Sequence, residues 1–578
     1  MEIDIESIES QSVDVEVEEI DGSSLNNETQ GDQLQRRKRK LTSKVWSHFV
    51  HLLLGPDKKL KAKYKHCSSA YLADSKYETE TTLGRISFTS YAWSSLASDG
   101  YVCLIAHFID NNWNLQKKVL NFSFMPPLHS GVVLSEKLYD FLSDWGIENK
   151  VFSVTLDNAF ANGVYVDMLR EQLVAKGVLV HNGDLFHMRC CAHILNLVVQ
   201  EGLKQIDDSI VKIRDSVNYV KGSQVRKQKF LDCVKLVAIG DKKGLCQDVP
   251  TRWNSTYLML ESTLYYRRVF QHLELSDSNY KHCPSTAEWD KVEKIKTFLK
   301  LFYDATLKFY ETKYPTANLY FPSIWHCCFM LKQYSEGDDE YLKCMAIAMW
   351  GKFQKYWSQF HLTLAITCVL DPHFKLGLVE FSYKKLYGDD CFECITMRST
   401  LYSIFEEYNK NNKDSTSQKT NIFEYFMTEK EGSDDVDVIF KEFDEMSSVE
   451  SSTASQKSKL DLYLDEPRLA RNAELDILSF WKSNQFRYPA LASMACDILA
   501  VPVSTVASEA TFSVGGRVLN SFRSSLKPKT IEALVCTKDW LYGDKDFNEE
   551  LEDLTQDIFN FSLKDDEPFS QVSSSPER

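Results

Sequence analysis

The chain of 578 residues has no apolar run near the roughly 20 residues that a membrane-spanning helix needs, so we expect no transmembrane segment. Its first 30 residues hold ten acidic residues and no Lys or Arg, which argues against a secretory signal. A general excess of positive charge is also missing, because 67 Lys and Arg face 82 Asp and Glu, a net charge of −15. This balance excludes a protein that coats nucleic acid over its whole surface, but it allows a local basic patch.

The 15 cysteines are scattered and do not form the spacing pattern of a small disulfide-stapled domain. We expect reduced thiols, as in a cytosolic or nuclear protein. Residues 1–40 are predicted to be a disordered acidic tail that ends in one basic block, and 543–578 a second acidic tail. The block indicates a nuclear localisation signal, and the alternative is a solvated charge run. It consists of Arg36, Arg37, Lys38, Arg39 and Lys40.

Residues 41–80 resemble the opening of a BED-type zinc finger, in which aromatic residues precede a Cys-x-x-Cys pair. Here Tyr64 stands at the first cysteine position, and Cys67 is the one cysteine left. A structural zinc site needs four nitrogen or sulfur ligands in tetrahedral geometry. Cys67 and the adjacent His66 supply too few, so we interpret this segment as a degenerate finger remnant without zinc. Zinc binding by the segment remains the alternative.

Patterns of apolar residues divide the remainder of the chain. Short runs with strand character at 86–94, 101–108, 118–124 and 151–156 predict strands, and a helical stripe between the third and fourth predicts a helix over one sheet face. Three strands, a helix and a fourth strand are the order in which a ribonuclease-H-like mixed α/β fold begins. We assign 86–200 to the first part of this core, 201–405 to an all-helical insertion, 406–459 to a flexible linker and 460–542 to a compact helical segment.

Two polar segments are candidate sites. Cys190 and His193 are three residues apart at the start of a helix and share one face, so they could be two ligands of a metal site. A structural Cys–His contact is the alternative that we favour. In the second segment Arg252 could hold a phosphate and Trp253 could stack on a base, although composition favours a core position for the tryptophan.

Five segments in order resemble the hAT superfamily of transposases, in particular its domesticated plant members. The segments are 87–110, 152–162, 189–196, 248–257 and 460–541. The resemblance implies a ribonuclease-H-like core interrupted by a helical insertion, and a C-terminal segment that completes the core and supports dimerisation. In active members three carboxylates, Asp, Asp and Glu, hold two magnesium ions against DNA phosphates, and the finger binds zinc and DNA.

Carried over to this chain, the three carboxylate positions fall on Tyr91, Asp157 and Ser521, so two acids are missing. Asp99 and Asp110 are expected to lie too far along the sheet to replace them. Glu509 precedes the third position by 12 residues, which is roughly 18 Å along a continuous helix. We therefore expect no transposase activity and no bound cofactor.

The sequence favours a domesticated, catalytically inactive, nuclear protein that binds DNA or chromatin, acts in transcriptional or developmental regulation and forms homodimers. DNA binding is weakened by the loss of the finger. An active transposase or nuclease, and a truncated product without a specific role, are the alternatives. An apolar face of the C-terminal segment is the candidate dimer interface, unless it packs inside one subunit. Its members include Trp481, Leu491, Met494, Ile498 and Phe512.

Overall fold

The computed structural model describes most of the chain between the two terminal tails. The described residues are 49–51, 61–64, 70–72, 79, 82–94, 100–125, 131–157, 161–205, 208–238, 243–249, 252–309, 317–427, 457–518 and 527–542. The predicted features that lie outside the description include the basic block at 36–40, His66 and Cys67 of the finger, Asp99, and Ser521. None of the described helices is both long and apolar enough to cross a membrane.

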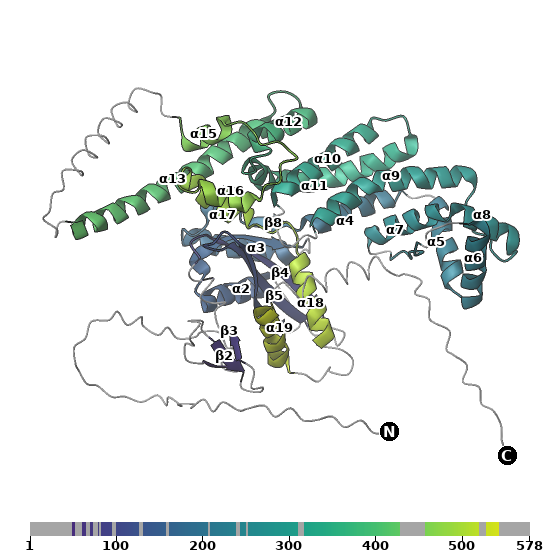
Figure 1. Cartoon of the computed structure of the whole chain (residues 1–578), viewed down its shortest axis with the longest axis horizontal. Helices are drawn as coiled ribbons and strands as arrows, with labels where there is room; N and C mark the ends of the chain where they lie inside the picture. The colour runs from purple at the N-terminus through teal and green to yellow at the C-terminus, as the bar shows by residue number, and fades with distance from the viewer. Residues whose placement is uncertain are drawn as a thin grey trace, which may run out of the picture. The chain divides into compact units, whose positions relative to one another are not determined.

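A five-stranded mixed sheet forms the core of the first part of the chain, as predicted (Figure 1). Its strand order is β6-β5-β4-β7-β8; β4, β5 and β6 are antiparallel, and β7 and β8 continue from β4 in parallel. Every residue of β5 is buried, because helices cover both faces of the sheet. The strands are β4 (Ile86–Ser94), β5 (Gly100–Ile109), β6 (Leu115–Met125), β7 (Val151–Leu156) and β8 (His187–Arg189).

The two faces of the sheet are covered by helices from opposite ends of the chain. Side chains such as Phe88 and Leu104 pack on α2 (Gly131–Trp145) and α3 (Ala161–Ala175). The alternate residues of the strands, such as Cys103, face two C-terminal helices. These are α18 (Val506–Val518) and α19 (Pro528–Tyr542).

The helix α19 is fixed to β6 by two buried polar contacts. Asp539 Oδ2 accepts the backbone N–H of Val119 at 2.7 Å, and Trp540 Nε1 donates to the carbonyl of the same residue at 2.8 Å. The backbone N–H and the backbone carbonyl of Val119 therefore both have hydrogen-bond partners on a helix more than 400 positions later in the chain. The predicted return of the C-terminal segment to the core is confirmed.

A predominantly helical region follows the sheet, as expected from the sequence (Figure 1). Its helices share one apolar core with α15, α16 and α17 of the C-terminal segment. The helix α13 continues to Met427, so the first part of the segment predicted as a flexible linker is helical. The helices are α4 (Cys191–Leu203), α5 (Asp208–Lys221), α6 (Gln224–Val237), α7 (Trp253–Tyr265), α8 (Arg267–Ser276), α9 (Thr286–Phe309), α10 (Ala317–Ser335), α11 (Glu340–Val369), α12 (Lys375–Tyr387), α13 (Phe392–Met427), α15 (Lys459–Asp465), α16 (Ile477–Asn484) and α17 (Pro489–Leu499).

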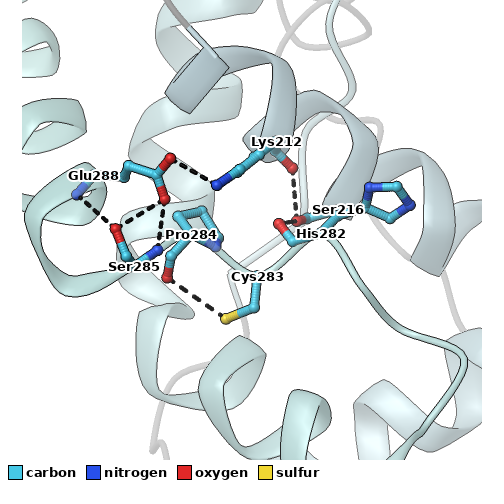
Figure 2. Close-up of polar contacts among 7 residues, drawn as sticks. All are labelled: Lys212, Ser216, His282, Cys283, Pro284, Ser285 and Glu288. Carbon is cyan, nitrogen blue, oxygen red and sulfur yellow. Dashed lines mark hydrogen bonds and ion pairs between the residues drawn. The ribbon is translucent and has the colours of Figure 1, made fainter.

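Local side-chain contacts fasten these helices to one another, and Figure 2 shows the joint between α5 and α9. Glu288 Oε2 accepts from the backbone N–H and the hydroxyl of Ser285 at 2.7 and 2.9 Å, and the Ser285 hydroxyl in turn accepts the Glu288 N–H. This reciprocal pair satisfies donors of the first helical turn. Glu288 Oε1 accepts from Lys212 Nζ at 2.7 Å, which ties the start of α9 to α5.

A second small sheet lies in the predicted finger segment. Its order is β1-β2-β3 and all pairs are antiparallel. In the register Tyr64, at the lost cysteine position, pairs with Phe49. The strands are β1 (Phe49–His51), β2 (Lys61–Tyr64) and β3 (Ala70–Leu72).

A buried polar junction joins the start of the sheet to the helical region. Asp497 on α17 accepts the backbone N–H of Arg85 at 2.7 Å and the Tyr408 hydroxyl at 2.6 Å. The Arg85 guanidinium lies 3.8 Å from the same carboxyl group and also donates to the carbonyls of Val151 and Val178. Burial raises the pKa of Asp497, while the Tyr408 hydrogen bond and Arg85 oppose this shift. The junction holds the sheet, α13 and α17 in one body.

Candidate functional site

The register of two parallel strands brings Tyr91 and Asp157 to the same end of the sheet, where β4 and β7 finish. Thr89 of β4 pairs with Thr155 of β7. Tyr91 and Asp157 each lie two residues further on, so they have the same facing as the paired threonines. Asp157 directly follows the last residue of β7. The predicted places of these two residues, on the first strand and at the end of the fourth, are confirmed.

The segment that leads into α18 covers this face of the two strands. Thr155 Oγ1 donates to the carbonyl of Pro502 at 2.6 Å, and Ser508 Oγ donates to Thr89 Oγ1 at 3.0 Å. The next residue, Glu509, receives a hydrogen bond of 3.3 Å from the Thr505 hydroxyl one turn earlier. A carboxylate therefore reaches the edge of the sheet from α18.

The charges of Glu509 and Asp157 interact across the end of β7. Glu509 is exposed at the protein surface, while the protein packed around its carboxyl group partly desolvates it. This burial raises the pKa of Glu509, and the negative charge of Asp157 raises it further, against the Thr505 hydrogen bond and the positive charge of Arg252. Glu509 lies in the first turn of α18, where that helix meets the sheet. The prediction that the third carboxylate position falls on Ser521, 12 residues later, stays a prediction because Ser521 is outside the described residues.

The Tyr91 phenol lies in the same negative environment. Burial raises the pKa of its hydroxyl, and the charges of Asp157 and Glu509 raise it further. The hydroxyl is therefore protonated and uncharged at neutral pH. Its ring packs on Phe512 of α18, with ring centroids 5.7 Å apart. We call Tyr91, Asp157 and Glu509 the acidic corner.

Arg252 and Trp253 have different environments although they are adjacent. Arg252 is exposed, and its positive charge acts on Glu509, so the helical insertion contributes a cation to the acidic corner. Trp253 is only 3% exposed and packs in the apolar core, which supports the core alternative and removes it from any base-stacking surface. Sequence reasoning did not link Arg252 to Glu509, because the charge interaction joins two segments far apart in the chain.

The start of α7 is held by Asp248, which has a buried side chain. Asp248 Oδ1 accepts hydrogen bonds from the hydroxyls of Ser255 and Thr256 at 3.1 and 2.8 Å, and Arg214 NH2 forms an ion pair with Oδ2 at 2.6 Å. These contacts fix the helix end next to Arg252. The polar residues of this motif thus position the arginine and do not form a site of their own.

Cys190 has a structural role at the start of α4, with Thr505 as the partner of its sulfur. Cys190 is buried at the start of α4, and its sulfur accepts from the backbone N–H and the hydroxyl of Thr505, both at 3.3 Å. Burial raises the pKa of the Cys190 thiol, which disfavours the thiolate that a metal would need. Among the described residues no group of three or more His, Cys, Asp or Glu is arranged to hold a metal ion.

Comparison with known proteins matches the same segments that form this core. Models of the ZBED1 RNase-like domain and the ZBED1 RNase-like helical domain match 89–185 and 188–298, and the model of the hAT-like transposase RNase-H fold matches 318–408. The model of the hAT family C-terminal dimerisation region matches 459–541.

Curated plant relatives align over the same region. Zinc finger BED domain-containing protein RICESLEEPER 2 of Oryza sativa subsp. japonica is 38% identical over 80% of this chain and 65% of its own length. Zinc finger BED domain-containing protein DAYSLEEPER of Arabidopsis thaliana is 34% identical over 82% of this chain and 67% of its own length. The chain belongs to the hAT transposase family. It spans about 65% of the length of RICESLEEPER 2.

The two magnesium ions of active hAT members do not fit the acidic corner as it stands. Magnesium is bound by hard oxygen ligands, above all carboxylates, and a pair of ions needs carboxylates that they can share. The described corner offers Asp157 and Glu509, and its third member is the uncharged phenol of Tyr91. The donor set therefore lacks one negative charge at the position where the family resemblance expects Asp.

The apolar residues proposed as a dimer interface are core residues of one chain. Trp481, Leu491, Met494 and Ile498 belong to the same apolar core as the helical region, and Trp481 Nε1 donates to the carbonyl of Leu370 at 3.0 Å. Phe512 packs against the sheet at 5.1 Å between ring centroids from Phe122. Assigning these five residues to a dimer interface was wrong, because amphipathic periodicity alone does not distinguish an interior partner from a second subunit. Any self-association through the hAT dimerisation region uses other residues.

Proposed function

We propose that this chain is a transposase-derived nuclear protein that binds DNA, associates with itself and regulates transcription or development without cutting DNA. The observation that carries the proposal is the acidic corner, in which the Tyr91 phenol lies beside two coupled carboxylates. An uncharged phenol cannot replace a carboxylate that is shared between two metal ions. The fold is that of the hAT RNase-H family, and Tyr91 stands where the family resemblance expects the first acid.

Binding and self-association are supported by family membership. RICESLEEPER 2 and DAYSLEEPER are named for a zinc finger BED domain, and the hAT dimerisation model matches 459–541 of this chain. The basic block at 36–40 supports a nuclear location. Because the net charge is −15, we expect DNA contact through local basic surfaces and a strong dependence on salt.

The test of inactivity uses the full chain and supercoiled plasmid with Mg²⁺ or Mn²⁺. We expect no nicked or linear product. Metal-dependent nicking that disappears in both the Asp157→Asn and Glu509→Gln variants would overturn the proposal. Nicking that survives in both variants comes from a contaminating nuclease and is removed by further purification before the result is read.

DNA binding is measured separately, by titrating labelled duplex DNA at several salt concentrations. We expect the logarithm of the association constant to fall linearly with the logarithm of salt concentration, as phosphate contacts require. No binding at low salt would overturn the DNA part of the proposal. Light scattering after gel filtration tests self-association, and a strictly monomeric chain at micromolar concentration would contradict it.

An active nuclease is the second candidate, and one observation favours it. Glu509 and Asp157 are electrostatically coupled, so the corner retains two of the acids that a metal-dependent reaction uses. The plasmid assay with both single variants distinguishes this candidate from the first.

A further inference from the structure

A groove of about 880 Å³ lies on the helical region, lined by residues of α10, α12 and the segment between α15 and α16. Its apolar lining includes Pro322, Leu378 and Leu469. Two aromatic side chains, Trp325 and Phe381, meet edge to face at 5.7 Å between ring centroids. Phe381 is 49% exposed, which is a large apolar surface to leave in water.

The segment that carries the arginines of the groove is fixed at two points. The backbone N–H of Leu469 donates to the carbonyl of Pro372 at 3.1 Å, and His373 Nε2 lies 3.2 Å from the carbonyl of Ala473. On the opposite wall Trp325 Nε1 donates to the carbonyl of Ser382 at 3.1 Å. The walls are therefore held before any ligand arrives, which lowers the entropy cost of binding.

Two guanidinium groups give the groove its charge. Arg468 and Arg471 both line it and are exposed, and in the described part of the chain no carboxylate forms an ion pair with either. The Arg468 guanidinium lies beside Gly377 of α12, where a Cβ would be in ordinary van der Waals contact with NH1 at 3.5 Å. Two acidic residues near the groove pair with other side chains: Asp371 binds His373, and Glu380 binds Arg398.

We propose that this groove binds an acidic peptide segment that carries an aromatic anchor. The apolar lining and the Phe381 ring accept the anchor, and Arg468 and Arg471 pair with carboxylates of the peptide. The site is separate from the acidic corner and does not depend on DNA binding.

Single-stranded nucleic acid fits the groove less well. A nucleic-acid channel stacks successive bases on exposed rings and follows the phosphates with a row of cations. Here one face of Trp325 is covered by Phe329, with ring centroids 5.7 Å apart and nearly parallel planes. The mostly apolar lining and two arginines match a short peptide with a few carboxylates.

The test measures fluorescence anisotropy of a dye-labelled synthetic peptide of Asp, Glu and Phe with the full chain. We expect saturable binding that is at least about tenfold weaker in the Arg468→Ala/Arg471→Ala variant, because charge-assisted hydrogen bonds are lost. Phe381→Ala should weaken binding of this peptide, and a peptide with Ser in place of Phe should bind the unchanged chain more weakly. The matched control Lys355→Ala/Lys410→Ala removes two exposed lysines elsewhere and should leave the affinity unchanged.

Three results would overturn the proposal. The first is no saturable binding by a chain whose circular dichroism shows the folded state. The second is equal affinity of the arginine variant and the lysine control. The third is displacement of the peptide by single-stranded oligothymidylate that binds more tightly and depends on the same arginines, which would assign the groove to nucleic acid.

Discussion

Glu509 lies close enough to Asp157 for the aspartate charge to raise its pKa, although the whole helical insertion separates the two residues along the chain. The pair forms because β7 ends at Leu156 and the segment before α18 crosses the same strand edge through Thr155 and Pro502. Two carboxylates held together at the edge of a sheet are a local excess of negative charge that a cation would relieve. Tyr91 is the neutral member of this group.

The variant Tyr91→Asp is expected to create a metal site. A third carboxylate beside Asp157 and Glu509 adds the missing negative charge, so we expect Mn²⁺ affinity to rise by about tenfold or more, or about 1.4 kcal/mol of binding free energy. Isothermal titration calorimetry with Mn²⁺ measures the change. Tyr91→Phe is the matched control, because it keeps the ring contact with Phe512 and adds no charge. Equal Mn²⁺ affinity of the wild type and the Asp variant would contradict this account of the acidic corner.

The sequence predicted the sheet well because its signals are local. Apolar runs such as β5 and the position of Asp157 after a buried strand depend on neighbouring residues. The interaction of Glu509 with Asp157 was not predicted for the opposite reason: it depends on how the C-terminal segment crosses the sheet, which spacing along one helix does not reveal. The same limit explains why core residues were assigned to a dimer interface, since the sequence of an apolar helix face does not show which part of the fold it packs against.

Substitution of Trp481 tests whether the apolar face lies in the core of one chain. Its indole is fully buried and donates to the Leu370 carbonyl, so Trp481→Ala is expected to cost about 3–5 kcal/mol of unfolding free energy through a cavity and a lost hydrogen bond. Urea unfolding followed by circular dichroism measures the loss. Trp481→Phe, which fills most of the space, should cost less. If Trp481→Ala changed the oligomeric state and left stability intact, the residue would belong to an interface after all.

Loss of the Asp497 carboxylate, the hydrogen-bond acceptor of the buried junction, is expected to lower stability. Asp497→Ala leaves the Tyr408 hydroxyl and the Arg85 N–H without their partner, and we expect a loss of about 3 kcal/mol or more. Asp497→Asn keeps one acceptor oxygen and should cost less. The exposed pair Lys457–Asp465 supplies the control, because Asp465→Ala should change stability by less than about 1 kcal/mol. Similar losses for Asp497→Ala and Asp465→Ala would contradict a structural role of the junction. Thermal and urea unfolding give both values.

The lowered pKa of His107 predicts that the protein loses stability as the pH falls. Its imidazole is buried beside Thr89, with 3.1 Å between Nε2 and the hydroxyl oxygen; burial, with the nearby charge of Lys117, lowers the pKa of His107 to about 3. The unfolded chain, with a histidine pKa near its ordinary value of about 6.5, therefore binds more protons than the folded chain between these two values. Stability contributed by the neutral imidazole is full above about pH 6.5 and falls by up to about 1.4 kcal/mol per pH unit as the pH drops.

Replacing this imidazole isolates its share of the acid sensitivity. His107→Gln removes the titrating group and keeps a polar side chain near Thr89, so its unfolding free energy should fall less steeply than that of the wild type between pH 6.5 and pH 5. The variant is expected to be less stable than the wild type at pH 7.5, because the packing and the hydrogen bond change there. The comparison therefore uses the slope against pH and not the absolute value, with urea unfolding curves recorded at each pH. Parallel curves for the two proteins would show that His107 does not stay neutral on folding.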